Sequence, residues 1–380
     1  MDVTLKGAIT DTDGSIKSLS IDWGDNDLNN FTTLDYAKIA QTHTYKTPGN
    51  YVISLTATDN LDEISTAKYV IKVDYKETSL MNIKQSMFKT SPGEYLILTI
   101  NLHTYQELRQ NEKFVIITDL IGKMDIDFVA IQECAQNKAS VITTGIIRTD
   151  NMALIIANQL KQKYNADYNF VWNWAHYGWD VWEEGIAVLS KHTVQSTDQR
   201  YISSNLSNTN IASRKAIYAS YSVNGEVFNI FSAHTHWRTS ETDQEQNRQI
   251  NSIKQMVTEK QLNNAASLSI VCGDFNGNPT DYTPWNEGYN TMTQSGEYID
   301  TFLAANPDAN TRPALSKYFT VSGSFPGRID YIFMKSNSKF KVINSQIVLS
   351  PEIAGIVSDH YGVLTKIQLI PPTRNVLHSR

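Results

Sequence analysis

The chain has 380 residues, with 33 Lys and Arg against 39 Asp and Glu, which corresponds to a formal net charge of −6. This length exceeds the usual size of a single hydrophobic core and therefore predicts two domains. No apolar run is long enough to cross a bilayer and there are only two cysteines, so we expect neither a transmembrane segment nor a disulfide-rich scaffold.

The negative charge is concentrated in the first part of the chain. Residues 1–75 hold 6 Lys against 11 Asp and Glu, a net charge of −5, which leaves residues 76–380 nearly neutral. Nonspecific binding to duplex DNA is largely electrostatic. The absence of a basic run therefore argues against a tight DNA-binding groove, but it is compatible with a nuclease that binds weakly and turns over.

The first segment, residues 1–75, is predicted to be all-β. Residues 52–58 alternate apolar and hydroxyl side chains, and residues 68–73 form a second, β-branched run. Three strings resemble the PKD domain: DTDGSI at 11–16, WGD at 23–25 and HTY at 43–45. The resemblance implies an immunoglobulin-like β-sandwich in which Trp23 is a core residue and His43 is structural. An earlier strand and a signal sequence are missing, which predicts a fragment with a truncated N-terminus.

The rest of the chain is predicted to be mixed α/β. Residues 76–93 lack periodicity and end in TSPG, which predicts a linker. Residues 111–124 carry apolar side chains at helical spacing, and residues 240–262 form the clearest helix, with Ser240 as its N-cap. Residues 371–380 begin with two prolines and are expected to be a tail.

Four short polar groups carry the chemistry of residues 94–370. They are QE at 132–133, GDFN at 273–276, RIDY at 328–331 and SDH at 358–360, and three of them follow apolar runs that are predicted to be buried strands. Carboxylates, an amide and a histidine at several strand ends can converge on one pocket. There they can hold a hard divalent cation through oxygen ligands and supply proton-transfer groups beside it.

These groups resemble the endonuclease/exonuclease/phosphatase superfamily, whose fold is deoxyribonuclease I-like. Further strings in family order are TINLH at 99–103, EGIAVLS at 184–190 and AHTHW at 233–237. The resemblance covers residues 95–369. It implies that residues 94–370 form a four-layer α/β/β/α sandwich, preceded by the β-sandwich of residues 1–75.

The resemblance also assigns the metal site and the water-activating group. Glu133 is expected to be the principal metal ligand, with Asn101 and Asp359 as further ligands. Mg²⁺ is the expected cation, with Mn²⁺ or Ca²⁺ as alternatives. Asp274 is expected to position or deprotonate the attacking water, and Asn276 to donate its amide to a phosphate oxygen.

Histidines are expected to stabilise the charge on the phosphate and to transfer protons during hydrolysis. Asp330 is expected to orient His360, which faces the phosphate as a base or as an electrostatic clamp. The resemblance selects His236 as the proton donor to the leaving oxygen, oriented by Glu184. His234 lies on the same strand face as His236, so either histidine can be presented to the site.

Aromatic residues are unusually dense at residues 171–182, which hold four of the seven tryptophans. Such rings form a stacking platform for bases, sugars or lipid groups, or they simply pack a hairpin over the sheet edge. The sequence leaves both readings open. Candidate substrate contacts are His103, His234, Trp179 and Trp237.

The predicted function is divalent-metal-dependent hydrolysis of a phosphodiester. A secreted, surface or periplasmic nuclease is expected first. A sphingomyelinase-type enzyme that acts on phospholipid head groups is the alternative, favoured by the tryptophans and the weak basic character. A phosphomonoesterase and a degenerate binding domain are lesser alternatives, and no stable protein partner is implied.

Overall fold

The computed structural model describes residues 1–45, 49–73, 77–279, 287–311, 316–323, 326–337 and 339–370. The chain divides into two compact units, Met1–Glu77 and Thr78–Arg380. Residues 371–380, the expected tail, lie outside the described residues. Among the residues that are described, no helix is long and apolar enough to span a membrane.

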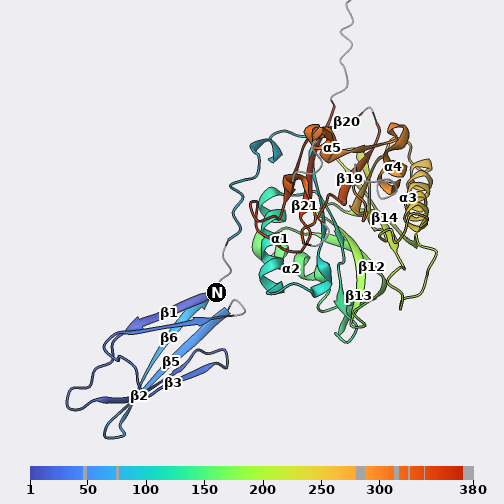
Figure 1. The fold of residues 1–380 in the computed structure, drawn as a ribbon. Coiled ribbons are helices and arrows are strands. Elements are labelled where there is room, and N and C mark those ends of the chain that lie inside the picture. Colours follow the sequence, from blue (N-terminus) through green and yellow to red (C-terminus); the bar gives the residue numbers. More distant parts are fainter. Residues whose placement is uncertain are drawn as a thin grey trace, which may run out of the picture. The chain divides into compact units, whose positions relative to one another are not determined.

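The N-terminal unit is built from β-strands alone in its described part (Figure 1). The strands are β1 (Asp2–Gly7), β2 (Ile16–Asp22), β3 (Leu28–Phe31), β4 (Ile39–Thr44), β5 (Gly49–Asp59) and β6 (Ile64–Val73). One antiparallel sheet has the order β3-β2-β5-β6, and β1 pairs with β4. The two strands expected from the sequence lie inside β5 and β6.

Trp23 lies at the centre of this unit and is fully buried. The Tyr45 hydroxyl donates to the Trp23 carbonyl at 2.8 Å, and the His43 ring stacks on the Trp23 ring at 4.9 Å. His43 Nε2 also lies 2.8 Å from Asp25 Oδ2. The contacts agree with the core position expected for Trp23 and with a structural role for His43.

Two β-sheets form the centre of the larger unit. The first contains β7 (Glu94–Asn101), β8 (Phe128–Gln132), β9 (Gln136–Asn137), β12 (Asn169–Gly178), β13 (Trp182–Ser190), β20 (Phe340–Val348) and β21 (Gly362–Leu369). Its order is β12-β13-β8-β7-β21-β20, with β9 beside β13. The second contains β14 (Val194–Tyr201), β15 (Lys215–Val223), β16 (Glu226–His234), β17 (Leu268–Asp274), β18 (Tyr298–Asp300) and β19 (Asp330–Lys335), in the order β14-β15-β16-β17-β19-β18. A small separate hairpin is made of β10 (Ile142–Thr144) and β11 (Ile147–Arg148).

Helices cover the outer faces of the two sheets (Figure 1). Helices α1 (Gln110–Met124) and α2 (Met152–Tyr164) share a buried apolar cluster with the first sheet. Helices α3 (Glu245–Leu262) and α4 (Glu287–Thr293) share another with the second sheet, and a third cluster lies between the sheets. Short helices are α5 (Thr301–Ala305), α6 (Asp308–Thr311), η1 (Gln85–Met87), η2 (His103–Tyr105), η3 (Gln294–Gly296) and η4 (Ser316–Tyr318). This is the expected four-layer α/β/β/α sandwich.

Helix α3 begins later than the sequence predicted. It starts at Glu245 and not at Ser240. The Asp243 carboxylate accepts from the backbone N–H of Thr239 and of Glu245, both at 2.9 Å, which closes a separate turn before the helix. Ser240 is therefore not the N-cap, because local side-chain hydrogen bonds compete with helix formation there.

Most of the expected linker packs on the larger unit. Ile83 and Met87 are buried in the cluster under α1 and α2. The backbone N–H of Thr78 donates to Asp119 Oδ2 at 3.0 Å. The connection between the units is therefore shorter than the expected range of residues 76–93.

Strand register brings the polar groups to one edge of the sheets. Strands β7 and β8 are parallel with Asn101 opposite Gln132, and β16 and β17 are parallel with His234 opposite Asp274. The carboxyl ends of parallel strands lie at the same edge. Gln132 Nε2 donates to Ser232 Oγ at 3.0 Å across the two sheets, which brings both pairs of strand ends together.

Candidate active site

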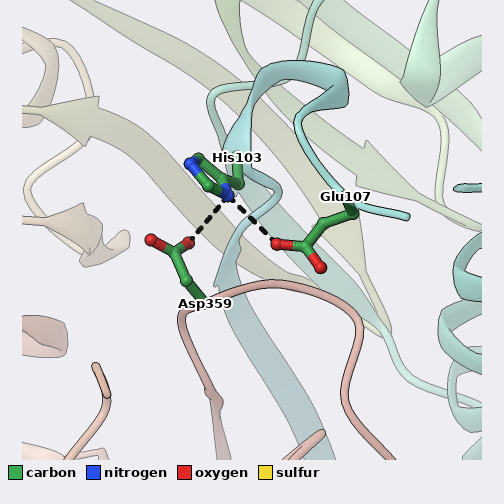
Figure 2. A group of neighbouring side chains, drawn as sticks. All are labelled: His103, Glu107 and Asp359. Carbon is green, nitrogen blue, oxygen red and sulfur yellow. Dashed lines mark hydrogen bonds and ion pairs between the residues drawn. The ribbon is translucent and has the colours of Figure 1, made fainter. Parts of the chain in front are cut away.

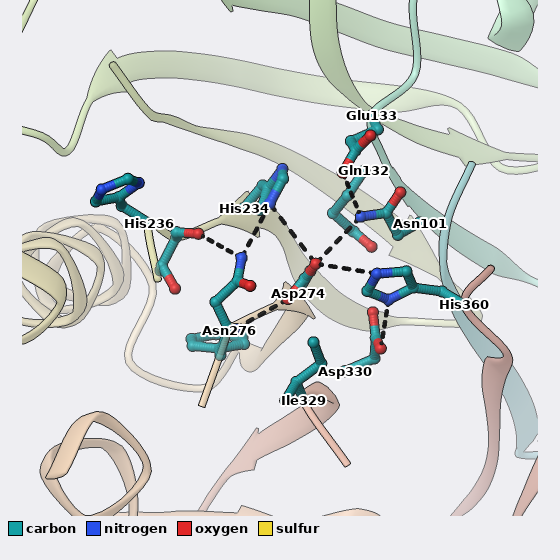
Figure 3. A network of polar contacts seen from close by, with 12 residues as sticks. Asn101, Gln132, Glu133, His234, His236, Asp274, Asn276, Ile329, Asp330 and His360 are labelled. Atoms are coloured by element: carbon teal, nitrogen blue, oxygen red, sulfur yellow. Dashed lines mark hydrogen bonds and ion pairs between the residues drawn. The ribbon is translucent and has the colours of Figure 1, made fainter. Parts of the chain in front are cut away.

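Asn101 joins the half-buried carboxylate of Glu133 to the buried carboxylate of Asp274 at the meeting point of the sheets (Figure 3). Its Nδ2 amide donates to Glu133 Oε1 at 2.9 Å and to Asp274 Oδ2 at 3.1 Å. Its oxygen accepts from the backbone N–H of His103 at 2.9 Å. Asn101 therefore turns its NH₂ group, and not the expected metal-binding oxygen, toward Glu133, because the two carboxylates attract the available donor.

The environment raises the pKa of both carboxylates. Burial and the nearby Glu184 carboxylate raise the pKa of Glu133 to about 7. Burial and the Asp330 carboxylate raise the pKa of Asp274 to about 7. Such buried acids ionise more readily when a cation comes close. A cation bound nearby would therefore stabilise the ionised form of both Glu133 and Asp274.

The same side chains fit a divalent cation. Glu133, His234 and Asp274 each offer a ligand atom, and these atoms lie within 4.8 Å of one another. The described hydrogen-bond donors to Glu133 are the uncharged side chains of Asn101 and Thr104. Oxygen and imidazole ligands suit a hard or borderline cation.

Asp359 belongs to a neighbouring group with His103 and Glu107 (Figure 2). His103 Nδ1 lies 3.0 Å from Glu107 Oε1 and 3.4 Å from Asp359 Oδ1. Among the described contacts none joins Asp359 to Glu133. The structure therefore places Asp359 against His103 in the turn after β7, and its expected role as a ligand beside Glu133 stays a prediction.

His360 is held in a charged state by Asp330. Its Nδ1 lies 2.9 Å from Asp330 Oδ2, and its Nε2 lies 3.8 Å from Asp274 Oδ2. Burial alone lowers the pKa of His360, but the Asp330 and Asp274 carboxylates outweigh burial and raise it to about 10. At neutral pH the ring is therefore an imidazolium, which cannot act as a base.

His234 lies against Asp274 and Asn276, and His236 has no described contact with either of them. His234 Nε2 lies 3.1 Å from Asn276 Nδ2 and 3.6 Å from Asp274 Oδ2. The His236 ring instead packs on Trp237 at 4.1 Å, and its buried Nδ1 has no hydrogen-bond partner. The sequence favoured His236, but β16 ends at His234, in register with Asp274, so His234 is the histidine that the structure places beside Asp274.

Asn276 is held next to both residues. Its backbone N–H donates to Asp274 Oδ1 at 2.9 Å, and its amide donates to the Thr235 carbonyl at 2.9 Å. Its φ of 47° is rare for a residue other than glycine. Gly273 is required for this turn, because a Cβ there would lie 1.9 Å from the Ala233 carbonyl oxygen.

Glu184 has different partners from those the sequence suggested. Its Oε1 lies 3.1 Å from His176 Nε2, and the Thr104 hydroxyl lies 2.9 Å from its Oε2 and 3.2 Å from Glu133 Oε2. No described contact joins Glu184 to His236, so its expected role as orienter of His236 is corrected. The neighbouring Glu183 instead pairs with Arg148 at 2.9 Å.

Arg214 is a site residue that the sequence did not reveal. It is 3% exposed, its guanidinium lies 3.7 Å from Glu184 Oε1, and its Nε has no hydrogen-bond partner. Burial lowers the pKa of its guanidinium, and its charge contributes to lowering the pKa of His234 well below the ordinary value, after burial itself. Neither Arg214 nor His176 belongs to a recognisable sequence motif. His176 lies on β12 and Arg214 lies just before β15, so only the packing of these segments buries them together.

The aromatic segment is mainly a packed hairpin. Trp172 is buried and donates to the Cys134 carbonyl at 2.6 Å, and Trp182 stacks on Tyr105 at 4.5 Å. Trp179 differs, since it is 57% exposed at the hairpin tip, with its ring 6.3 Å from the ring of His103. Trp237 is 41% exposed.

Fold and site together define a metal-dependent phosphoric ester hydrolase. The chain belongs to the endonuclease/exonuclease/phosphatase family, whose profile matches residues 98–360. The PKD domain profile matches residues 1–73. Members of the family generally depend on divalent metals, which agrees with the acidic and histidine groups of the site.

Solved structures share the fold of the larger unit. A family protein from Leptotrichia buccalis is 27% identical with a TM-score of 0.61, over 72% of this chain and 99% of that one. The catalytic domain of human Nocturnin is 17% identical with a TM-score of 0.53, over 73% and 95%. A mannosyl-6-phosphatase from Bacteroides thetaiotaomicron is 16% identical with a TM-score of 0.51, over 73% and 99%. None of the curated proteins matches the chain.

Proposed function

We propose that the larger unit hydrolyses a phosphodiester by in-line attack of water, with a divalent cation. The surroundings of the Asp274 carboxylate carry this proposal. Its Oδ2 lies 3.1 Å from Asn101 Nδ2, 3.6 Å from His234 Nε2 and 3.8 Å from His360 Nε2. A carboxylate with a pKa near neutrality among such donors can orient and deprotonate a water molecule.

His360 and Asn276 stabilise the charge that develops on the phosphate. The His360 imidazolium supplies a fixed positive charge, and Asp330 holds its ring in one orientation. Asn276 offers its amide beside Asp274. Arg214 adds a second buried positive charge next to His234. Since burial and Arg214 lower the pKa of His234, its ring is neutral and orients Asn276 rather than donating a proton.

Glu133 is the residue that would anchor the cation, with His234 and Asp274 within reach. A bound divalent cation neutralises the phosphate and polarises it for attack. Mg²⁺ is the proposed ion, with Mn²⁺ and Ca²⁺ as alternatives. Thr104 holds Glu133 in position through its hydroxyl.

Two substrate classes are proposed. Nucleic acid comes first, as expected for a nuclease from the sequence. A phospholipid head group is the second candidate, and a specific observation favours it: exposed apolar side chains lie on the loops beside the site. We also propose that the protein is secreted or held at the cell surface, which the PKD domain supports; detection in the cytosolic fraction alone would contradict this.

A substrate panel tests the proposed chemistry. DNA, RNA, phosphatidylcholine, sphingomyelin and bis-p-nitrophenyl phosphate are incubated with protein and Mg²⁺, with and without EDTA. Hydrolysis of at least one phosphodiester, stopped by EDTA and by Asp274→Asn, is the expected result. Absence of any hydrolysis, or hydrolysis that is indifferent to chelation, contradicts the proposal.

A further inference from the structure

Exposed apolar side chains of the larger unit gather at the catalytic edge. In the part of the unit that the structure describes, they lie mostly on loops that follow or precede the catalytic strand ends: Leu108, Val141, Ile142, Ile146, Trp179, Val181, Leu206, Ile211, Trp237 and Ile356. Only Met81, Leu262 and Ile370 lie elsewhere among the exposed large apolar residues described there. Single exposed apolar residues are ordinary, but their concentration on one edge marks an interaction surface.

Several of these loops are joined next to the site. The backbone N–H of Lys138 donates to the Val181 carbonyl at 3.0 Å, and that of Thr149 donates to the Val141 carbonyl at 2.8 Å. The first bond ties the loop that carries Val141 to the tip of the β12–β13 hairpin, and the second closes that loop on itself. The tip is next to His103, which belongs to the group with Asp359 (Figure 2).

The hairpin tip presents Trp179 under backbone strain. Trp179 and Asp180 have φ values of 49° and 56°. Two-residue turns of this kind favour Asn and Gly, so a tryptophan there is costly. The Val181 N–H closes the turn on the Gly178 carbonyl at 3.1 Å. A large ring that is held exposed in a strained turn indicates a contact with something outside the chain.

We infer that this apolar rim docks the protein on a surface of zwitterionic phospholipid, whose head groups carry the phosphodiester. The inference rests on the proposed function. Apolar side chains at the tips of several separate loops can each insert into a deformable lipid interface. Tryptophan is especially favourable at such an interface. The exposed charges beside them have both signs, as at Lys138 and Asp180, and the unit is nearly neutral. Nucleic acid would instead select a basic surface.

Binding to vesicles of pure phosphatidylcholine tests the rim. The full chain is sedimented with vesicles in EDTA, so that no lipid is hydrolysed. The double variant Val141→Ser with Ile142→Ser should bind about tenfold more weakly or worse, since each apolar side chain that enters the interface contributes strongly. Leu108→Ser, on a separate loop, should also weaken binding, so the test does not depend on one variant.

Matched controls lie on the remaining exposed apolar residues. Leu262→Ser and Met81→Ser remove comparable side chains away from the catalytic edge and should bind vesicles like the wild type. Thermal unfolding checks that every variant is folded. If the controls and the rim variants bind equally, the rim has no special role and the inference is overturned.

Other outcomes are equally decisive. Binding of the wild type only to vesicles with anionic lipid, lost at high salt, would mean electrostatic adsorption and overturn the inference. Binding to plasmid DNA but not to vesicles would overturn it in favour of nucleic acid. Hydrolysis of the substrate panel by the wild type is measured separately. Hydrolysis of any phosphodiester without vesicle binding rejects the rim alone, and absence of hydrolysis of every one of them rejects the proposed function.

Discussion

His360 Nδ1 lies 2.9 Å from Asp330 Oδ2, and Asp330 is fully buried. The other oxygen of Asp330, Oδ1, has no hydrogen-bond partner. The buried carboxylate therefore depends on the imidazolium for compensation, and the imidazolium on the carboxylate. This mutual dependence keeps His360 positively charged at neutral pH.

Replacing Asp330 by Asn should return His360 to a neutral ring at pH 7. The pKa of His360 is about 10 in the wild type, and burial alone lowers it. NMR titration should show His360 charged throughout the neutral range in the wild type and neutral in Asp330→Asn, with turnover reduced roughly 10²–10³-fold. Titration of wild-type His360 near 6.5 would contradict this account.

The same pair should shape stability against pH. The pKa of His360 is raised in the folded state. The contribution of the His360–Asp330 pair to the free energy of unfolding is therefore fully present below the ordinary pKa of 6.5 and is lost as pH rises through about 10. Denaturant unfolding should therefore show that the stability gap between the wild type and Asp330→Asn narrows over that interval. A constant gap would argue against the ion pair.

Divalent cations should stabilise the larger unit, and more strongly at higher pH. The pKa values of Glu133 and Asp274 are both raised to about 7, so without a cation stability falls as pH rises from their ordinary values of 4.5 and 3.8 through that point. Thermal unfolding with Mg²⁺ should show a smaller fall than with EDTA. Glu133→Gln should remove the difference, and an unchanged Mg²⁺ effect in that variant would exclude Glu133 as the anchor.

Asp274→Asn should reduce kcat by roughly 10²–10⁴-fold without loss of the fold, since the amide keeps the shape but cannot take a proton. Asp198→Asn is the matched control. Asp198 lies on β14 and pairs with Arg200 and Lys260, so its loss should leave kcat near the wild-type value. Near wild-type turnover by Asp274→Asn would reject its role.

Arg214→Gln should lower kcat by roughly 10²–10³-fold, because a buried charge facing the site is lost. It should also raise the pKa of His234, since Arg214 is the largest electrostatic cause of its lowered value after burial. Arg200→Gln, which breaks a pair with Glu259 on the surface, serves as the control. An unchanged His234 titration in Arg214→Gln would show that the two side chains do not interact.

Removing residues 1–77 should leave cleavage of bis-p-nitrophenyl phosphate within about twofold of the full chain. All the described site residues lie in the larger unit, and its packed segment begins at Thr78. A standard enzyme assay on both proteins checks this. A tenfold loss by a folded, shortened chain would mean that the PKD domain supports the site.

The motifs predicted the fold because they report local rules, and they named the side chains that the structure brings to one edge of the two sheets. Glu133, Asp274 and Asp330 each adjoin a strand that its own apolar residues define, and the strand pattern survives in β8, β17 and β19. The sequence could not tell which of His234 and His236 lies beside Asp274, because both share a strand face. Only the register of β16 against β17 distinguishes them, and register is a non-local property.

The sequence by itself determined the two domains, the four layers and the residue types of a metal-assisted hydrolase. The reason is that polar and apolar alternation, helical spacing and strand-end motifs depend only on residues that are close together in the chain. Tertiary structure alone decided which partners those residues take. Glu184 pairs with His176, Asp359 pairs with His103, and Arg214 is buried beside His234. Contacts of this kind depend on how separate strands and loops pack, so no spacing along the chain encodes them.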